Sequence, residues 1–272
     1  MDIGSEMLPD NPAARLQSLL RNMLKTKYES SEQIAVVFAR MLEVENQPSE
    51  IFPHYSQLFT LIEDAYNKVM QYYPRQEKTH SVWRVYFTDI FQKYSPYHHQ
   101  WVALLNAIQQ GNHLDMIQIA NDNLEHYVLP TQVNGLTIDE LEEQVSKLIA
   151  DIMDSDDLSD YLKIYLTEEL KRMLVYIKHF DLYGSEPIKK SIYNIIANTE
   201  VSKNIKSKAI TGVSALLITV ASAIGVINDV ASIQGSIEYL KTQFNLLSDD
   251  SANHSSTQNS SEPELLLRAE KK

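Results

Sequence analysis

The sequence lacks cysteine altogether and holds only seven glycines in 272 residues. Without cysteine the chain forms no disulfide, no thiolate zinc site and no cysteine nucleophile, which fits a reducing compartment. The glycines lie too far apart to build a phosphate-binding loop. The net charge of −12 is opposite to the basic excess of a protein that binds nucleic acid over its whole surface. What remains is a chain whose hydrophobic content of 44% is ordinary for a packed core.

The first residues lack the features of a targeting signal. Residues 1–12 contain neither a basic stretch nor a long apolar run. We therefore expect a cytoplasmic protein, which would be associated with the inner membrane if an apolar segment later in the chain inserts.

Helical periodicity runs through almost the whole sequence. Apolar residues recur every three or four positions, as in Leu16, Leu20 and Met23, and no stretch alternates as a strand would. Residues 137–140 form a capping box that begins the second half. The sequence therefore predicts an all-α fold, a multi-helix bundle of about ten helices with a disordered C-terminal tail.

Composition divides the chain into three parts. Residues 1–130 predict a helical domain that is aromatic and basic in its second half. Residues 131–247 predict an acidic helical hairpin followed by an apolar helix. Residues 248–272 are polar and of low complexity, which predicts disorder.

Charge is unevenly distributed between the first two parts. Residues 65–110 hold five bases and two acids, whereas residues 112–172 hold fourteen acids and four bases. Bases interleaved with aromatic side chains can hold phosphates and stack on nucleotide bases, or bind a protein partner. We favour instead a tyrosine-rich helical core with a solvated basic face, so nucleic acid is a possible but not a favoured ligand. This basic aromatic patch consists of Arg75, Lys78, Trp83, Arg84, Lys93 and Trp101.

The segment 209–227 is apolar, free of charge and preceded by three lysines. Its length just reaches across a bilayer, but serine, threonine and glycine make insertion marginal. Its apolar residues are spaced alternately by three and four, as in a coiled-coil seam. Two interpretations stay open: a core helix of the bundle, or a helix that oligomerises or inserts into a membrane. The residues concerned are Ile210, Gly212, Val213, Leu217, Val220, Ala221, Ile224, Gly225 and Ile227.

Two arginine–histidine pairs raise a catalytic alternative. Arg75 and His80, and likewise Arg172 and His179, fit the Arg-x(4–6)-His spacing and so resemble the HEPN ribonucleases. That resemblance implies arginine stabilising phosphate charge and histidine transferring a proton. No metal site and no cofactor is expected, because the Glu-x-x-His spacing of di-iron bundles occurs only at Glu77.

The stretch from Leu170 to Ile195, with the phrase Phe-Asp-Leu-Tyr-Gly-Ser-Glu-Pro-Ile at 180–188, resembles a loose group of uncharacterised bacterial all-helical proteins. The resemblance covers about residues 137–245 and brings no catalytic residues with it. It implies a non-enzymatic bacterial protein, an accessory or effector of a defence or toxin-type system. Our leading hypothesis is that this protein acts through self-association or membrane contact of residues 209–227. The alternatives are a HEPN-like ribonuclease and a soluble adaptor that binds a protein partner.

Overall fold

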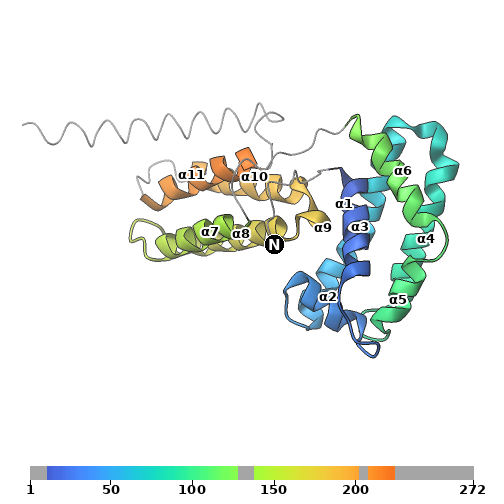
Figure 1. Ribbon diagram of the computed structural model, residues 1–272. Coiled ribbons are helices and arrows are strands. Elements are labelled where there is room, and N and C mark those ends of the chain that lie inside the picture. The colour runs from blue at the N-terminus through green and yellow to red at the C-terminus, as the bar shows by residue number, and fades with distance from the viewer. Residues whose placement is uncertain (1–10, 128–137, 202–207, 224–272) are drawn as a thin grey trace, which may run out of the picture.

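The computed structural model describes residues 11–127, 138–201 and 208–223, which form eleven α-helices and one short 3₁₀ helix without a strand (Figure 1). The predicted all-α, multi-helix fold is thereby confirmed. The predicted disordered tail lies outside the described residues, as does the domain boundary expected near residue 130. The described helices form two units that lie side by side and are joined at α9 (Figure 1).

The first unit is built on α1 and α3, which pack against each other, with α6 against α1 and α4 against α3. Asn11 caps α1 by accepting from the backbone N–H of Ala13, and its Nδ2 donates to Oδ1 of Asn121 at 2.8 Å. One buried amide therefore both begins α1 and ties it to α6. The helices are α1 (Pro12–Lys25), α2 (Ile34–Leu42), α3 (Pro48–Tyr72), α4 (Glu77–Lys93), α5 (Trp101–Ile108) and α6 (His113–Glu125), with the 3₁₀ helix at Pro74–Gln76.

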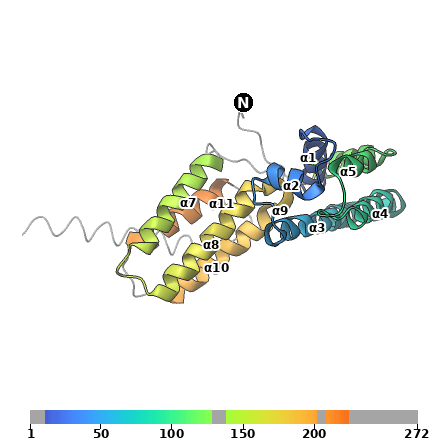
Figure 2. The ribbon, with the colours of Figure 1, turned by 90° about the horizontal axis from the view of Figure 1, so that it is seen from below.

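The second unit is a bundle of four helices with its own hydrophobic core. Its helices are α7 (Ile138–Met153), α8 (Asp160–Lys178), α10 (Ser185–Val201) and α11 (Lys208–Ala223). Ser159 caps α8 by accepting from the backbone N–H of Leu162. Helix α8 lies between α7 and α10 and packs against both (Figure 2), which leaves its remaining face uncovered within the described part of the chain.

The short helix α9 (Phe180–Tyr183) connects the two cores. Leu182 is buried in the core of the first unit, whereas Phe180 is buried in the core of the second. The chain reverses at Gly184, whose φ of 70° and ψ of −167° lie in a region that residues with a Cβ rarely adopt. Apolar residues continue at helical spacing from α8 into α9, but the structure ends α8 at Lys178 and begins α9 two residues later.

Arg15 of α1 is buried against this reversal. Its Nη1 donates to the carbonyl oxygen of Leu182 at 3.5 Å. A Cβ added to Gly184 would lie only 2.5 Å from the guanidinium carbon of Arg15. The absence of a side chain at residue 184 therefore admits both the backbone conformation and the arginine.

Helix α11 contributes to the core of the second unit. Val213, Leu217, Val220 and Ala221 are buried, and α11 packs mainly against α7. A Cβ at Gly212 would lie 2.9 Å from Cδ1 of Leu148, so the absence of a side chain there permits close packing. For this stretch the core interpretation of the apolar seam is the one observed. Ile224, Gly225 and Ile227 lie outside the described residues, as does the side chain of Ile210.

None of the helices in the described ranges is long and apolar enough to span a membrane.

We expect Gly184→Ala to lower the free energy of unfolding by at least about 2 kcal/mol, because alanine strains the backbone and displaces Arg15. Gly111, which also has a positive φ of 71°, is the matched control. Its replacement by alanine meets only the ring of His113 and should cost about 1 kcal/mol. Urea unfolding measures both, and equal losses would contradict a special role of the Arg15 contact.

Replacing Leu217 by aspartate places a charge in the core of the second unit and should cost more than about 3 kcal/mol. The same change at the exposed Ala215, two residues earlier on α11, should cost no more than about 0.5 kcal/mol. Thermal unfolding followed by circular dichroism separates the two. If Leu217→Asp were harmless, α11 would not belong to the bundle core.

Candidate functional site

The first arginine–histidine pair has a histidine that is closed off inside the first unit. His80 is fully buried, and its Nδ1 accepts from the indole Nε1 of Trp83 at 3.1 Å. Its Nε2 therefore carries the proton and donates to Oε1 of Gln76 at 2.9 Å. Arg75 is exposed on the 3₁₀ helix. Both ring nitrogens of His80 thus have partners within the fold, and neither is directed to a substrate.

The basic aromatic patch is divided between core and surface. Trp83 and Trp101 are fully buried, so neither indole can stack on a nucleotide base. Arg84 pairs with Glu63 at 2.7 Å and lies over the ring of Tyr66. Arg75, Lys78 and Lys93 are exposed. Within the patch the two indoles therefore belong to the core, whereas Arg75, Lys78 and Lys93 lie on the surface.

The second arginine–histidine pair lies on α8 and at its C-terminal end. Arg172 extends toward the N-terminal side, where its Nη1 bonds to Oε1 of Glu169 at 2.5 Å. His179 follows the last residue of α8 and lies at the junction of the two units. The structure thus directs these two side chains to different neighbours.

Around His179 the junction holds a cluster of aromatic and titratable side chains. The rings of His54 and His179 meet edge to face with centroids 5.0 Å apart. The hydroxyl of Tyr183 lies 2.9 Å from Nδ1 of His54, and Tyr176 contacts the ring of Tyr183. No sequence pattern indicates this cluster, because His54 and His179 are 125 positions apart (179 minus 54).

Burial shifts the pKa values of the titratable side chains in the cluster. Desolvation, followed by smaller electrostatic effects of His54 and Lys178, lowers the pKa of His179 to about 4. Desolvation also lowers the pKa of His54, against a smaller opposite effect of Glu50. The pKa of Tyr183 is raised to about 12, chiefly by burial. These rings are therefore neutral at pH 7 and act as packing and hydrogen-bonding groups.

A second polar group lies on the α1 side of the junction. Ser18 Oγ donates to Oδ2 of Asp181 at 3.2 Å. Burial raises the pKa of Asp181, while the Ser18 bond and the charge of Arg15 act in the opposite direction. Burial likewise raises the pKa of Asp64, which also feels the charge of Arg15. The charge of Arg15 thus acts on two acidic side chains from different helices.

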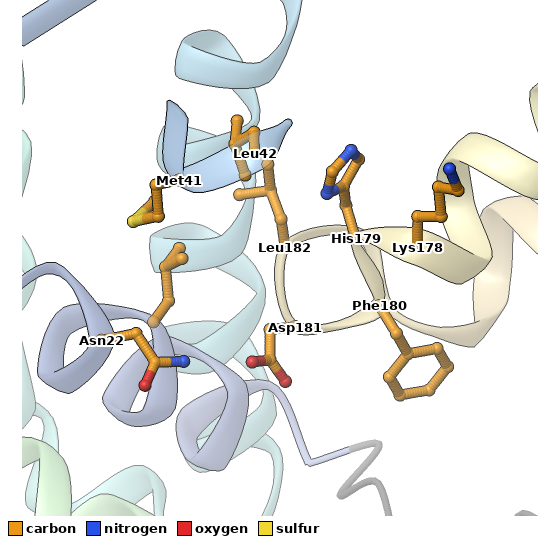
Figure 3. Close-up of a pocket in the computed structure, with 9 residues that line it drawn as sticks. Asn22, Met41, Leu42, Lys178, His179, Phe180, Asp181 and Leu182 are labelled. Carbon is orange, nitrogen blue, oxygen red and sulfur yellow. The ribbon is translucent and has the colours of Figure 1, made fainter. Parts of the chain in front are cut away.

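A recess of about 190 Å³ opens at this junction (Figure 3). Asp181 points toward α1, while Leu182 and Phe180 point in opposite directions (Figure 3). The recess is smaller than the roughly 300–1,000 Å³ typical of small-molecule sites. Its lining residues are Leu19, Asn22, Met41, Leu42, Lys178, His179, Phe180, Asp181 and Leu182.

The outer face of α8 leads away from this recess and carries exposed apolar side chains. Tyr161 and Ile164, exposed to 74% and 61%, are the most exposed large apolar side chains among the described residues. Val175 lies on the same face and is 38% exposed. This face was not predicted from the sequence, although a signal for it is present: α8 carries apolar residues on two sides, whereas a bundle needs only one.

The described residues contain no group of three or more side chains that could hold a metal ion. Comparison with known protein families, with curated proteins and with solved structures finds no match to this chain. The resemblance to bacterial helical proteins, and the defence or toxin-type setting that it implies, therefore stay predictions. The fold and the junction define an all-α protein of two helical units joined by α9.

We expect the stability of the protein to fall as the pH drops below about 6.5. The unfolded histidines take up protons near pH 6.5, whereas the folded state resists protonation of His179 down to about pH 4. Between these values the unfolded state binds more protons, so acid favours unfolding.

His179→Asn should reduce the loss of unfolding free energy between pH 7 and pH 5 by at most about 2 kcal/mol, measured by urea unfolding. The same substitution at the exposed Gln109, which does not titrate, is the control and should leave the pH dependence unchanged. Identical pH profiles for wild type and His179→Asn would contradict the assignment.

Proposed function

We propose that this chain is a non-enzymatic helical protein that works by self-association, with the outer face of α8 as its contact surface. The observation that carries the proposal is the exposure of Tyr161, Ile164 and Val175 on a single face of one helix. Exposed apolar side chains gathered on one element are typical of a protein–protein contact surface.

The physical argument rests on the two sides of α8. Leu166, Leu170 and Met173 are buried and already supply the bundle core. The apolar residues of the outer face therefore contribute nothing to the core of their own unit. Removing such side chains from water favours association by about 25 cal/mol for each Å² of apolar surface buried.

Helix α8 supports self-association better than the segment 209–227 does. The apolar seam residues Val213, Leu217 and Val220 already pack inside their own bundle. A contact with a second molecule through these residues would require the bundle to open. Membrane contact of the same segment would require the same opening and stays a prediction.

A soluble adaptor is the second candidate, favoured by the recess at the junction. The recess is open to solvent beside α2 and α9 and has the size of a single side chain rather than of a cofactor. A side chain of a protein partner anchored there would be held by apolar walls from Leu19, Met41 and Leu42. The ribonuclease alternative lacks comparable support, since His80 is closed off and Arg172 is directed to Glu169.

Sedimentation velocity over a concentration series tests self-association directly. We expect a concentration-dependent dimer for the wild type and a monomer for Ile164→Asp, because the aspartate would have to be desolvated in the contact. Val85→Asp is the matched control, since Val85 is a 51% exposed aliphatic residue on α4 in the other unit. This variant should dimerise like the wild type. A wild-type protein that stays monomeric throughout would contradict the proposal.

A further inference from the structure

The residues along the outer face of α8 are complementary to the same residues taken in reverse order. Starting at Tyr161, the face continues with steps of three and four residues through Ile164, Glu168, Lys171, Val175 and Lys178. Such a spacing keeps side chains on one stripe of a helix, as in a coiled-coil seam. The stripe lies opposite the buried residues of α8, which include Leu162, Leu166, Leu170 and Met173.

We propose that two copies of this chain pair through α8 in antiparallel fashion, around a two-fold axis that passes between residues 169 and 170. This inference rests on the self-association proposed above and adds its surface, orientation and register. With this axis Ile164 faces the partner's Val175, and Glu168 faces the partner's Lys171. Each contact occurs twice, as the symmetry of a two-fold dimer requires.

Charge distinguishes the antiparallel arrangement from the parallel one. Glu168 and Lys171 are 55% and 58% exposed and are 3.6 Å apart as an i,i+3 pair within one helix. In a parallel pair of helices in register, Glu168 would face another Glu168 and Lys171 another Lys171. The antiparallel pair instead places opposite charges across the axis. Such exposed pairs add little affinity, but they select the register.

The ends of the stripe meet at the junction of the two units. The partner's Tyr161 lies opposite Lys178, which lines the recess and pairs with Glu142 at 2.7 Å. The aliphatic stem of Lys178 offers an apolar surface to the tyrosine ring. The partner's Tyr161 is therefore the aromatic anchor of the contact, and it lies at the opening of the recess.

A second copy of the chain fits this face better than an unrelated protein would. The sequence of the stripe supplies both halves of each inner contact, apolar with apolar and acid with base, and places Tyr161 against the partner's Lys178 at each end. A single pair of 19-residue helices extends only about 28 Å, so we expect a reversible, concentration-dependent dimer rather than a permanent one.

Charge reversal tests the register in the full-length protein. In the Glu168→Lys dimer the new lysine faces the partner's Lys171, and this contact occurs twice. In the Lys171→Glu dimer the new glutamate faces the partner's Glu168, again twice. Each variant should raise the dissociation constant at least about tenfold, as measured by sedimentation velocity.

Mixing the two charge variants in equal amounts should restore a dimer, now a heterodimer. The two residues still carry like charges within each helix, so repair of the intrahelical pair cannot explain the recovery. Failure of the mixture to recover would overturn the proposed register.

Disulfide cross-linking tests the orientation of the two helices. Because the native sequence has no cysteine, only the introduced cysteines can form disulfides. Single-cysteine variants Ile164→Cys and Val175→Cys are mixed and oxidised, and the disulfides are mapped by mass spectrometry. Antiparallel pairing predicts a disulfide between residues 164 and 175 of different chains. Disulfides that join 164 to 164 would indicate parallel pairing and overturn the proposal. Val85→Cys on α4 is the control and should not cross-link.

The outcomes separate this inference from the function on which it rests. A monomeric wild type would overturn both. A wild-type dimer that is unaffected by the charge variants, and that forms no 164–175 disulfide, would leave self-association standing but overturn its assignment to α8. Cross-linking of α8 only to an unrelated protein would overturn the choice of a second copy.

Discussion

The insertion of Leu182 into the core of the first unit is the contact on which the arrangement of the two units depends. Leu182 belongs to a helix of only four residues, and Phe180, two positions earlier, is buried in the other core. An isolated helix of this length is unstable in water, so α9 is held by what it packs against on both sides. Gly184 and Arg15 then fix the direction in which the chain leaves α9. The outer face of α8 and the recess are oriented by the same few residues.

The junction combines apolar packing with titratable groups whose pKa values are shifted by burial. His54 and His179 stay neutral because the folded protein shields them from water. Burial raises the pKa values of Asp181 and Asp64, and the charge of the buried Arg15 acts in the opposite direction. Such a junction determines how the two units meet, since each buried polar group needs its own partner. Removing these polar groups from water, however, costs free energy of folding.

The sequence was sufficient to predict the helices, but not how they pack against one another. Periodicity predicted the helix that contains Leu16, Leu20 and Met23, and the capping box at 137–140 anticipated the start of α7 at Ile138. The break after Lys178 cannot be predicted from the sequence, because apolar spacing continues across it and the hydrogen-bond partner of Leu182 lies on α1, far away in sequence. The two tryptophans show the same limit: composition placed them in a basic aromatic region, but only packing reveals that both indoles are buried. For the site, His179 was found by spacing alone, whereas its neighbour His54 is brought to it only by the tertiary fold.

The position of those two tryptophans has a consequence for how the protein can be observed. Trp83 and Trp101 are the only tryptophans of the chain, and both lie in the core of the first unit. The four-helix unit that follows contains only tyrosine and phenylalanine as aromatic residues. Indole emission therefore reports on the first unit alone, while far-ultraviolet circular dichroism reports on both. The chain thus carries a natural optical label on one side of α9, which reveals whether the two cores melt together or one after the other.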